Sequence, residues 1–282
     1  MTRQKHREGY RDERGAEPGK EGNEKRKSRR RRNRRKARIR FLASMLGTLL
    51  GAVLLVLVAY TALNLFCGFG KVNTQKLREQ GYPESLIALV ERNPETKDFV
   101  LDYPKYKGLE EIDISKEVTK GEIPHFLQWD ERWGYETYGS DFLAVTGCGP
   151  TSLSMVVCGL TGDTKWNPYE VAKMAEDNGY YVDGSGSSWE LMSSGAEKLG
   201  LTVSNVIFDA EHIRATLEAG QPIICVMGPG DFTDAGHFLV LTGVDQEGDI
   251  ILQDPNSVER TKQHWDVQKL MNQMKNLWSY CV

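Results

Sequence analysis

The sequence predicts an α+β domain that stands behind one transmembrane helix. Three observations lead to this prediction: an apolar run without charges, a later stretch in which helix patterns precede strand patterns, and an uneven distribution of charge. The formal net charge of the 282 residues is −3, yet residues 1–40 carry +12 and residues 121–282 carry −14. The chain therefore joins physically different segments. Its acidic C-terminal part argues against nucleic-acid binding, because phosphate binding needs a cationic surface.

The apolar run, residues 41–66, is predicted to cross a membrane as one helix. About 20 helical residues span the hydrocarbon core of a bilayer, and these 26 residues hold no charged side chain. The alternatives are a buried core helix, which normally keeps a polar stripe, and a cleaved signal peptide, whose apolar core is shorter. Because the basic residues 25–40 precede the run, the positive-inside rule predicts a cytoplasmic N-terminus and an extracellular remainder, residues 67–282.

Four segments are predicted along the chain. They are a basic disordered cytoplasmic tail, a transmembrane helix, an extracellular stalk with short helices and a globular domain: residues 1–40, 41–66, 67–120 and 121–282. In the stalk, Pro83 opens a short helical pattern and Asn93-Pro94 closes it. The last segment holds all six Trp and is long enough to bury a core without disulfides.

Helix and strand patterns follow one another in a definite order after residue 121. Helices are predicted where apolar residues recur at helical spacing and Asn, Pro or Gly marks an end, over residues 149–160, 168–178, 189–199, 210–219 and 266–275. Strands are predicted over short apolar runs, at residues 201–207, 222–227, 237–244, 249–253 and 277–281. Helices that come first and an antiparallel sheet that comes later are typical of the α+β class.

Cys148 is the candidate nucleophile. It lies in Thr-Gly-Cys-Gly-Pro-Thr-Ser, where Pro150 suits the first turn of a helix. The thiol then sits at the positive end of a helix dipole, which stabilises the reactive thiolate. The alternatives are a buried thiol or half of a disulfide. Cys158 fits a buried thiol, and ten residues of helix, about 15 Å, prevent a bond between the two. Five cysteines leave at least one free or paired between chains.

His237 is the candidate general base and Asp254 the acid that orients it, since a thiolate nucleophile needs both. His237 stands immediately before an apolar strand, and the next predicted strand ends at Asp254. A four-residue loop over 245–248 pairs residue 237 with residue 256, which places Asp254 diagonal to His237 on the same face of the sheet. An odd loop would put the two on opposite faces. The alternative is a capping histidine and a turn aspartate without a shared role.

Acyl transfer also needs hydrogen-bond donors for an oxyanion. The backbone N–H of Cys148 supplies one, and Gln128 is the candidate for the second; the alternative is an ordinary surface glutamine. Residues 184–189 are predicted to form a turn and helix cap, or the edge of a cleft, and residues 229–233 a rim or mobile flap. Because no Cys/His pair has the spacing of metal ligands, neither a metal nor another cofactor is predicted.

These motifs, in this order, resemble the papain-like cysteine peptidases related to bacteriocin-leader (double-glycine) peptidases, and among them the stand-alone relatives without a transporter. The resemblance covers about residues 83–282 and includes Gly-Cys-Gly-Pro-Thr-Ser, Gly-His-Phe and Asp-Pro. It implies a papain-like fold with a helical lobe and an antiparallel sheet. It also implies Cys148 as nucleophile, His237 as base, Asp254 as orienting acid and Gln128 in the oxyanion hole. The chain departs from the namesake group because it has no ATP-binding cassette.

The expected function is that of a membrane-anchored extracellular thiol hydrolase. It would cleave peptide or isopeptide bonds through a Cys-His-Asp triad and an acyl-enzyme, while spanning the cell membrane once. The expected partners are a peptide or cell-wall peptide substrate and the lipid bilayer through residues 41–66, with no nucleic acid. The alternatives are a cell-wall amidase or transpeptidase of the same chemistry and a catalytically silent surface binding module. A buried or disulfide-bonded Cys148 would favour the silent module.

Overall fold

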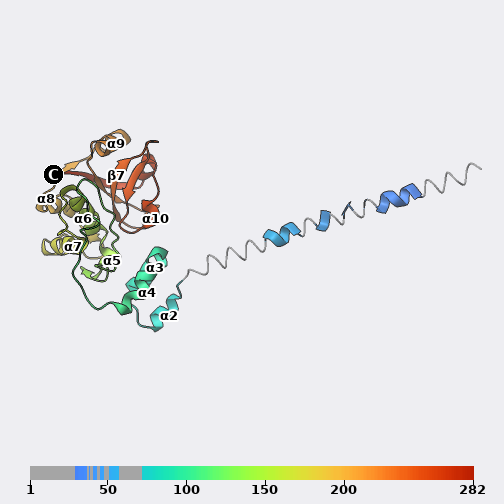
Figure 1. Ribbon diagram of the computed structural model, residues 1–282, viewed down its shortest axis with the longest axis horizontal. Coiled ribbons are helices and arrows are strands. Elements are labelled where there is room, and N and C mark those ends of the chain that lie inside the picture. The colour runs from blue at the N-terminus through green and yellow to red at the C-terminus, as the bar shows by residue number, and fades with distance from the viewer. Residues whose placement is uncertain (1–28, 37, 39–40, 43–44, 48–50, 57–71) are drawn as a thin grey trace, which may run out of the picture. The chain divides into compact units, whose positions relative to one another are not determined.

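A computed structural model of the chain describes residues 29–36, 38, 41–42, 45–47, 51–56 and 72–282 (Figure 1). The chain divides into two compact units, Met1–Gly70 and Lys71–Val282. In the first unit, residues 1–28 of the predicted tail lie outside the described residues, and residues 29–36 are helical and exposed. The division into four segments stays a prediction.

The predicted transmembrane helix over residues 41–66 is wrong. Among the residues that the structure describes, no helix has the length and apolar character needed to span a membrane. The described helical pieces of the run are residues 41–42, 45–47 and 51–56, and its other residues lie outside the described ranges. The predicted single-pass membrane location is wrong on the same finding.

The second unit is built on a five-stranded antiparallel sheet, so the α+β part of the prediction is confirmed. Its strand order is β5-β9-β6-β7-β8, and every neighbouring pair is antiparallel. The strands are β5 (Thr202–Asn205), β6 (Ile223–Met227), β7 (His237–Val244), β8 (Ile250–Gln253) and β9 (Met274–Cys281). Two short hairpins lie outside this sheet: β1 (Thr137–Tyr138) with β2 (Asp141–Phe142), and β3 (Tyr181–Val182) with β4 (Gly186–Ser187).

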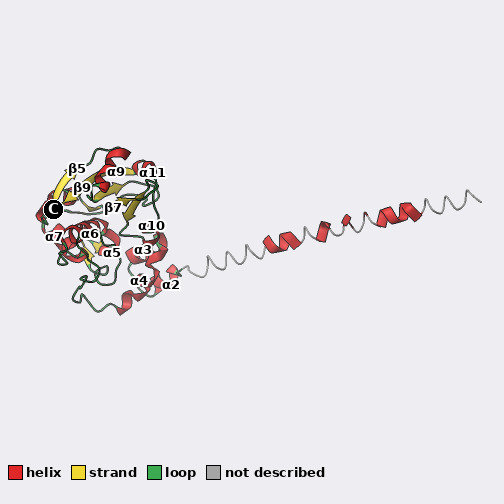
Figure 2. Ribbon diagram, turned by 45° about the horizontal axis from the view of Figure 1, so that its top comes forward, coloured by secondary structure: helices red, strands yellow, loops and turns green. Residues whose placement is uncertain are grey.

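Helices cover both faces of the sheet. Alternate residues of its strands point to opposite faces and belong to two separate hydrophobic cores. Ile224 and Val226 of β6 belong to the core beneath the first helices, whereas Ile223 and Cys225 belong to the core on the other face. The first face packs against α6 (Cys148–Thr161), α7 (Pro168–Asp177), η3 (Trp189–Met192) and α8 (Ser194–Lys198). The second packs against α9 (Ala210–Glu218) and α11 (Val267–Met271). Figure 2 shows α6 and α7 on one side of the sheet and α9 and α11 on the other.

The N-terminal helices of this unit form a third core with the loop before α6. These elements are α2 (Thr74–Glu79), α3 (Glu84–Arg92), η1 (Pro94–Thr96), α4 (Lys97–Asp102), η2 (Tyr103–Lys105) and, in the loop, α5 (Leu143–Thr146). Leu86 and Ile87 are fully buried there. Phe99 stacks on Tyr135 with ring centroids 4.2 Å apart, and the Tyr135 hydroxyl donates to the Phe99 carbonyl at 2.6 Å. Residues of the predicted stalk therefore belong to the same compact unit as the sheet.

Two predicted helices end differently in the structure. The pattern over 189–199 is divided into η3 and α8 at Ser193, whose backbone leaves the helical region (φ −109°, ψ −91°). The pattern over 266–275 ends at Met271, and β9 begins at Met274. Because β9 pairs with strands on both sides, its backbone gains two sets of hydrogen bonds, which outweigh the helical propensity of Met and Lys.

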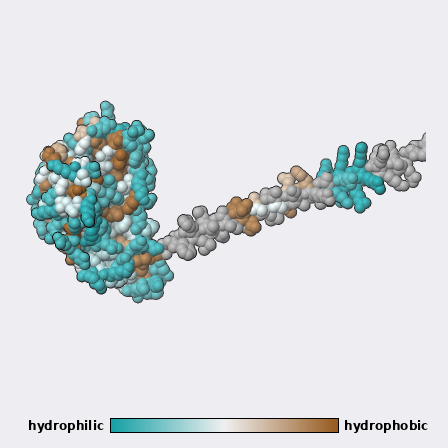
Figure 3. Space-filling model, viewed as in Figure 1, coloured by the Kyte–Doolittle hydropathy of each residue, from teal (hydrophilic) through white to brown (hydrophobic). Residues whose placement is uncertain are grey.

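The surface of the unit is mostly hydrophilic on the face shown in Figure 3, with separate apolar patches. Among the described residues of the unit, large exposed apolar side chains include Trp189, Ile207 and Phe208. Most other large apolar side chains lie in the three cores, which therefore account for the packing of this unit.

We predict that Leu86→Ala lowers the free energy of unfolding by about 2–5 kcal/mol, because it removes a fully buried side chain from the third core. The measurement is a urea titration followed by tryptophan fluorescence. All six Trp lie after residue 121, so a shifted midpoint shows that the N-terminal helices unfold together with the sheet. Leu101→Ala, at a side chain that is 37% exposed, is the control and changes the value by less than about 0.5 kcal/mol. An unchanged midpoint for Leu86→Ala would contradict the packing.

Candidate active site

Cys148 is the first residue of α6, as its sequence motif predicts. The residue before it, Gly147, has no side chain to cap the helix, so the first-turn N–H groups stay available. The backbone N–H groups of Gly149 and of Phe238, at the start of β7, lower the pKa of the Cys148 thiol. Gly149 packs closely against Ser187, because a Cβ atom at this position would clash with the Ser187 side chain. The first residues of α6 and of β7 therefore lie next to each other at the thiol.

The structure brings three of the predicted site residues together. His237 is the first residue of β7 and is 5% exposed, and its imidazole lowers the pKa of the Cys148 thiol. Its Nε2 atom lies 2.7 Å from Oδ1 of Asp254, which is fully buried. Since Nε2 is engaged by the carboxylate, Nδ1 is the ring nitrogen left for the thiol. The order thiol, imidazole, carboxylate is the order that nucleophilic catalysis requires.

The register that joins His237 to Asp254 is reached differently from the prediction. The last paired residues of the hairpin, Val244 and Ile250, enclose five residues, which is an odd loop. Taken alone, this loop would place His237 and Asp254 on opposite faces. However, the register shifts by one residue between Leu241 and Gly243. This β-bulge restores the pairing of Leu241 with Leu252, and with it the shared face of the two site residues.

Arg260 holds the second oxygen of Asp254 and was not predicted from the sequence. Its Nε atom donates to Oδ2 at 2.5 Å, while the backbone N–H of Asn256 donates to Oδ1 at 2.8 Å. Arg260 lies on α10 (Val258–Thr261), for which Ser257 is the N-cap. The sequence signal for this helix is Ser257, three positions before Arg260. Its side chain accepts the Arg260 N–H and so caps the helix.

Electrostatic balance at the three residues favours a thiolate–imidazolium pair. Burial alone raises the pKa of Cys148, but the hydrogen bond and charge of His237, with the Phe238 and Gly149 N–H groups, lower that pKa overall. Burial lowers the pKa of His237, yet the carboxylate of Asp254 and the thiolate raise it above its usual range. Burial also opposes ionisation of Asp254, but His237 and Arg260 lower its pKa to about 2.

Gln128 is buried, 3% exposed, and is held between two parts of the site rather than lying on the surface. Its Nε2 atom donates to the Ala144 carbonyl at 2.7 Å, and its backbone N–H donates to the Pro255 carbonyl at 2.7 Å. Its Oε1 atom is buried without a hydrogen-bond partner among the described residues. Among the hydrogen bonds of the described residues, none joins Gln128 to Cys148 or to His237. The structure therefore places Gln128 beside the Asp254 turn without a direct contact to the thiol.

His125 is a further residue of this region that sequence reasoning missed. Its Nε2 atom lies 2.8 Å from the Asp254 carbonyl oxygen and 3.2 Å from Oγ1 of Thr261. Burial lowers its pKa, although the Asp254 carbonyl and neighbouring carboxylates oppose this effect. His125 supports the backbone of Asp254, whereas His237 contacts its side chain.

Two segments singled out in the sequence border the site. Residues 184–189 contain β4, whose Ser187 lies against Gly149 and hydrogen-bonds with Tyr138 at 2.8 Å. Residues 229–233 are held down rather than free at a rim, because Phe232 is buried and packs on Trp265 with ring centroids 4.6 Å apart. The first segment therefore lies beside the first turn of α6, and the second is fixed by its aromatic residue.

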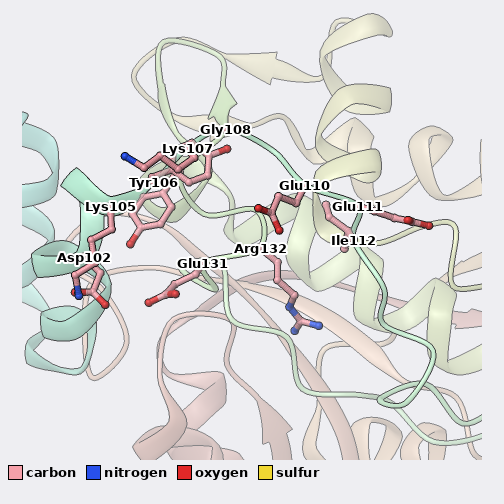
Figure 4. Close-up of a pocket in the computed structure, with 11 residues that line it drawn as sticks. Asp102, Lys105, Tyr106, Lys107, Gly108, Glu110, Glu111, Ile112, Glu131 and Arg132 are labelled. Carbon is pink, nitrogen blue, oxygen red and sulfur yellow. The ribbon is translucent and has the colours of Figure 1, made fainter.

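A cavity of about 330 Å³ lies between the segment 102–112 and the segment 131–135 (Figure 4). Its lining, all within the described range, does not include Cys148, His237 or Asp254. Several of its charges are paired, since Arg132 binds Glu117 and Lys105 binds Asp102. The cavity is thus separate from the thiol site.

The cysteines of the described part of the chain are free: Cys148, Cys158, Cys225 and Cys281. Cys148 is half-buried and unbonded, which removes the disulfide that would have favoured a silent module. Burial raises the pKa of Cys158 to about 12 and that of Cys225 further. In the described residues, no group of His, Cys, Asp and Glu side chains is arranged to hold a metal ion.

Comparison with known proteins assigns the chain to a family. Residues 120–282, more than half of the chain, match the Peptidase_C39 like family. The chain belongs to this family, which confirms the resemblance to bacteriocin-leader-type cysteine peptidases and indicates a cysteine peptidase. Among solved structures, a protein of Bacillus anthracis named as a C39-like peptidase is similar at 20% identity and a TM-score of 0.34. The match covers 58% of this chain and 97% of that one. No curated protein matches the chain.

We predict that alkylation by iodoacetamide selects Cys148 and stays fast at mildly acidic pH. Because the pKa of Cys148 is lowered, its thiolate persists as the pH falls below the usual thiol value of about 8.5. Cys158 and Cys225 have raised pKa values and react slowly. The measurement is the pH profile of the labelling rate, with the labelled peptide identified by mass spectrometry. A parent protein in which Cys148 titrates near the usual value would contradict the ion pair, and Cys158→Ala is the control that leaves the profile unchanged.

Proposed function

We propose that the protein is a thiol hydrolase that cleaves peptide or isopeptide bonds through Cys148, His237 and Asp254. The single observation that supports this proposal most strongly is the 2.7 Å contact of the His237 imidazole with the buried carboxylate of Asp254, because the same imidazole lowers the pKa of the Cys148 thiol. Membership in a peptidase family agrees with it. The position of Cys148 at the N-terminus of a fourteen-residue helix adds electrostatic stabilisation to its thiolate.

In the proposed mechanism, the Cys148 thiolate attacks the carbonyl carbon of the scissile bond, and the electron pair of the carbonyl moves to its oxygen. The tetrahedral intermediate then collapses, and the leaving amine takes the proton from Nδ1 of His237. This leaves an acyl-enzyme, in which the substrate is joined to Cys148 as a thioester. A water molecule attacks the thioester while His237 accepts its proton, and the carboxylic acid product departs as the thiolate is restored.

Asp254 has an orienting role in this mechanism. Its hydrogen bond to Nε2 keeps Nδ1 directed at the thiol and stabilises the protonated ring. Arg260 keeps the carboxylate ionised and fixes its second oxygen. Because both oxygens are engaged, the carboxylate has little freedom to rotate away from His237.

The oxyanion is assigned to the backbone N–H of Cys148 and to Gln128. The first is a helix N-terminal N–H without an intrahelical partner. The side-chain amide of Gln128 has two hydrogens, of which the Ala144 carbonyl takes one. The second is the donor that we assign to the oxyanion, after a local adjustment on substrate binding.

We predict that Cys148→Ala lowers kcat for a fluorogenic peptide panel by about ten-thousandfold or more, on the scale of nucleophile removal in other triad hydrolases. The fold should survive, because the side chain is needed for chemistry. Asp254→Asn should also lower kcat strongly, since it removes the charge that stabilises the imidazolium. Cys158→Ala is the matched control and keeps activity, as its thiol lies in the core. If Cys158→Ala loses activity while Cys148→Ala retains it, Cys148 is not the nucleophile.

We predict a different signature for Gln128→Ala. Removal of an oxyanion donor costs about 3–4 kcal/mol of transition-state stabilisation, which appears in kcat. The pH profile of Cys148 alkylation should be nearly unchanged, because iodoacetamide alkylation forms no oxyanion. The two measurements are made side by side on the full chain. If alkylation changes as much as kcat, Gln128 acts on the geometry of the thiol and not on the oxyanion.

A further inference from the structure

A short segment before the family-matched residues contacts the turn that holds Asp254. This segment, Asn93–Glu95, follows α3 and lies outside the match over residues 120–282. The Asn93 side chain is 8% exposed, and its Nδ2 atom donates to the Asn256 carbonyl at 2.6 Å and to Oδ1 of Asn256 at 3.1 Å. Figures 1 and 2 both show α3 beside α10.

Glu95 caps the helix that follows this turn. Its Oε2 atom accepts the backbone N–H groups of Val258 at 2.8 Å and Glu259 at 3.3 Å, and its Oε1 atom accepts the Ser257 hydroxyl. These N–H groups belong to the first turn of α10 and have no partner within the helix. A carboxylate at this position also complements the positive end of the helix. Because α10 has only four residues, it depends on such contacts for its order.

The same short helix supplies two contacts to Asp254. Arg260 donates to its side chain at 2.5 Å, and Oγ1 of Thr261 accepts its backbone N–H at 2.9 Å. An uninterrupted series of hydrogen bonds therefore runs from Glu95 through α10 to Asp254, and from there to His237. A displacement of α10 would free one oxygen of a fully buried carboxylate.

We propose that Glu95 is a positioning residue: through α10 and Arg260 it fixes the carboxylate of Asp254 and so maintains the charged pair of His237 and Cys148. This inference rests on the proposed thiol chemistry and adds to it a residue outside the family-matched region. Glu95 is itself fixed, because Pro94 restricts the backbone and Oδ1 of Asn93 accepts the Glu95 N–H at 3.1 Å. The other ionisable groups that face Glu95 are His125 and Lys262, and Glu259 lies beside Lys262.

The test compares Glu95→Ala and Glu95→Gln with the parent in the full chain. The readouts are the pH profile of Cys148 alkylation and the separate values of kcat and KM for a peptide substrate. In Glu95→Ala, we expect the alkylation profile to move toward that of an ordinary thiol and kcat to fall by about five- to thirtyfold, the effect on an equilibrium of losing a helix cap. KM should change little. Glu95→Gln keeps an acceptor oxygen and should recover part of both effects.

Two controls separate positioning from general stability. Glu91→Ala removes an exposed carboxylate from α3 that pairs with Arg78, and it should match the parent in both readouts. Arg260→Gln tests the route: if Glu95 acts through Arg260, adding Glu95→Ala to Arg260→Gln produces little further loss, so the two changes are not additive. Should Glu95→Ala fail to fold, the comparison of Glu95→Gln with Glu91→Gln decides by the same profiles.

The outcomes distinguish this inference from the proposed function. Suppose that the thiol pKa is lowered in the parent and shifts in Asp254→Asn, but does not shift in either Glu95 variant. This result overturns the positioning role and leaves the proposed function standing. Full additivity of Glu95→Ala with Arg260→Gln also overturns it. A parent thiol that titrates near its ordinary value rejects the proposed function itself, before Glu95 is considered.

Discussion

The buried carboxylate of Asp254 is the group on which the arrangement of the site depends. A fully buried charge is costly unless each oxygen is paired and hydrogen-bonded, and here the partners come from different elements. His237 stands at the start of β7, Arg260 on α10, and the N–H of Asn256 in the turn between β8 and that helix. The carboxylate therefore fixes the relative positions of a strand, a turn and a short helix. The ring of His237, held in this way, faces Cys148 at the start of α6.

Two structural devices make this pairing possible. The first is the β-bulge between Leu241 and Gly243, which corrects the face that the five-residue hairpin loop would otherwise impose. The second is the packing of α6 against the first face of the sheet, which places the N-terminus of α6 near the start of β7. Gly149 allows the close approach to Ser187 that this packing needs. A change of one residue in either the loop or the bulge would move His237 away from Asp254, since strand side chains alternate between faces.

The compact unit is larger than the part that defines the family. The family match begins at residue 120, whereas the compact unit begins at Lys71. The added helices share a core with Tyr135 and Ala144, which lie in the loop before α6, and they also contact the turn after β8. They therefore touch both sides of the thiol site without supplying any of its three main residues. This placement is the physical basis for assigning them a supporting role.

The sequence by itself determined what depends on local pattern: the α+β class, Cys148 at a helix start, and His237 and Asp254 at strand ends, because caps, glycines and period-two runs are local signals. Only the tertiary structure decided the contacts between distant segments. Arg260, His125 and the neighbours of Gln128 depend on a turn and a bulge whose geometry no short window specifies. The transmembrane prediction for residues 41–66 was wrong, because no helix among the described residues has the length and apolar character to span a membrane.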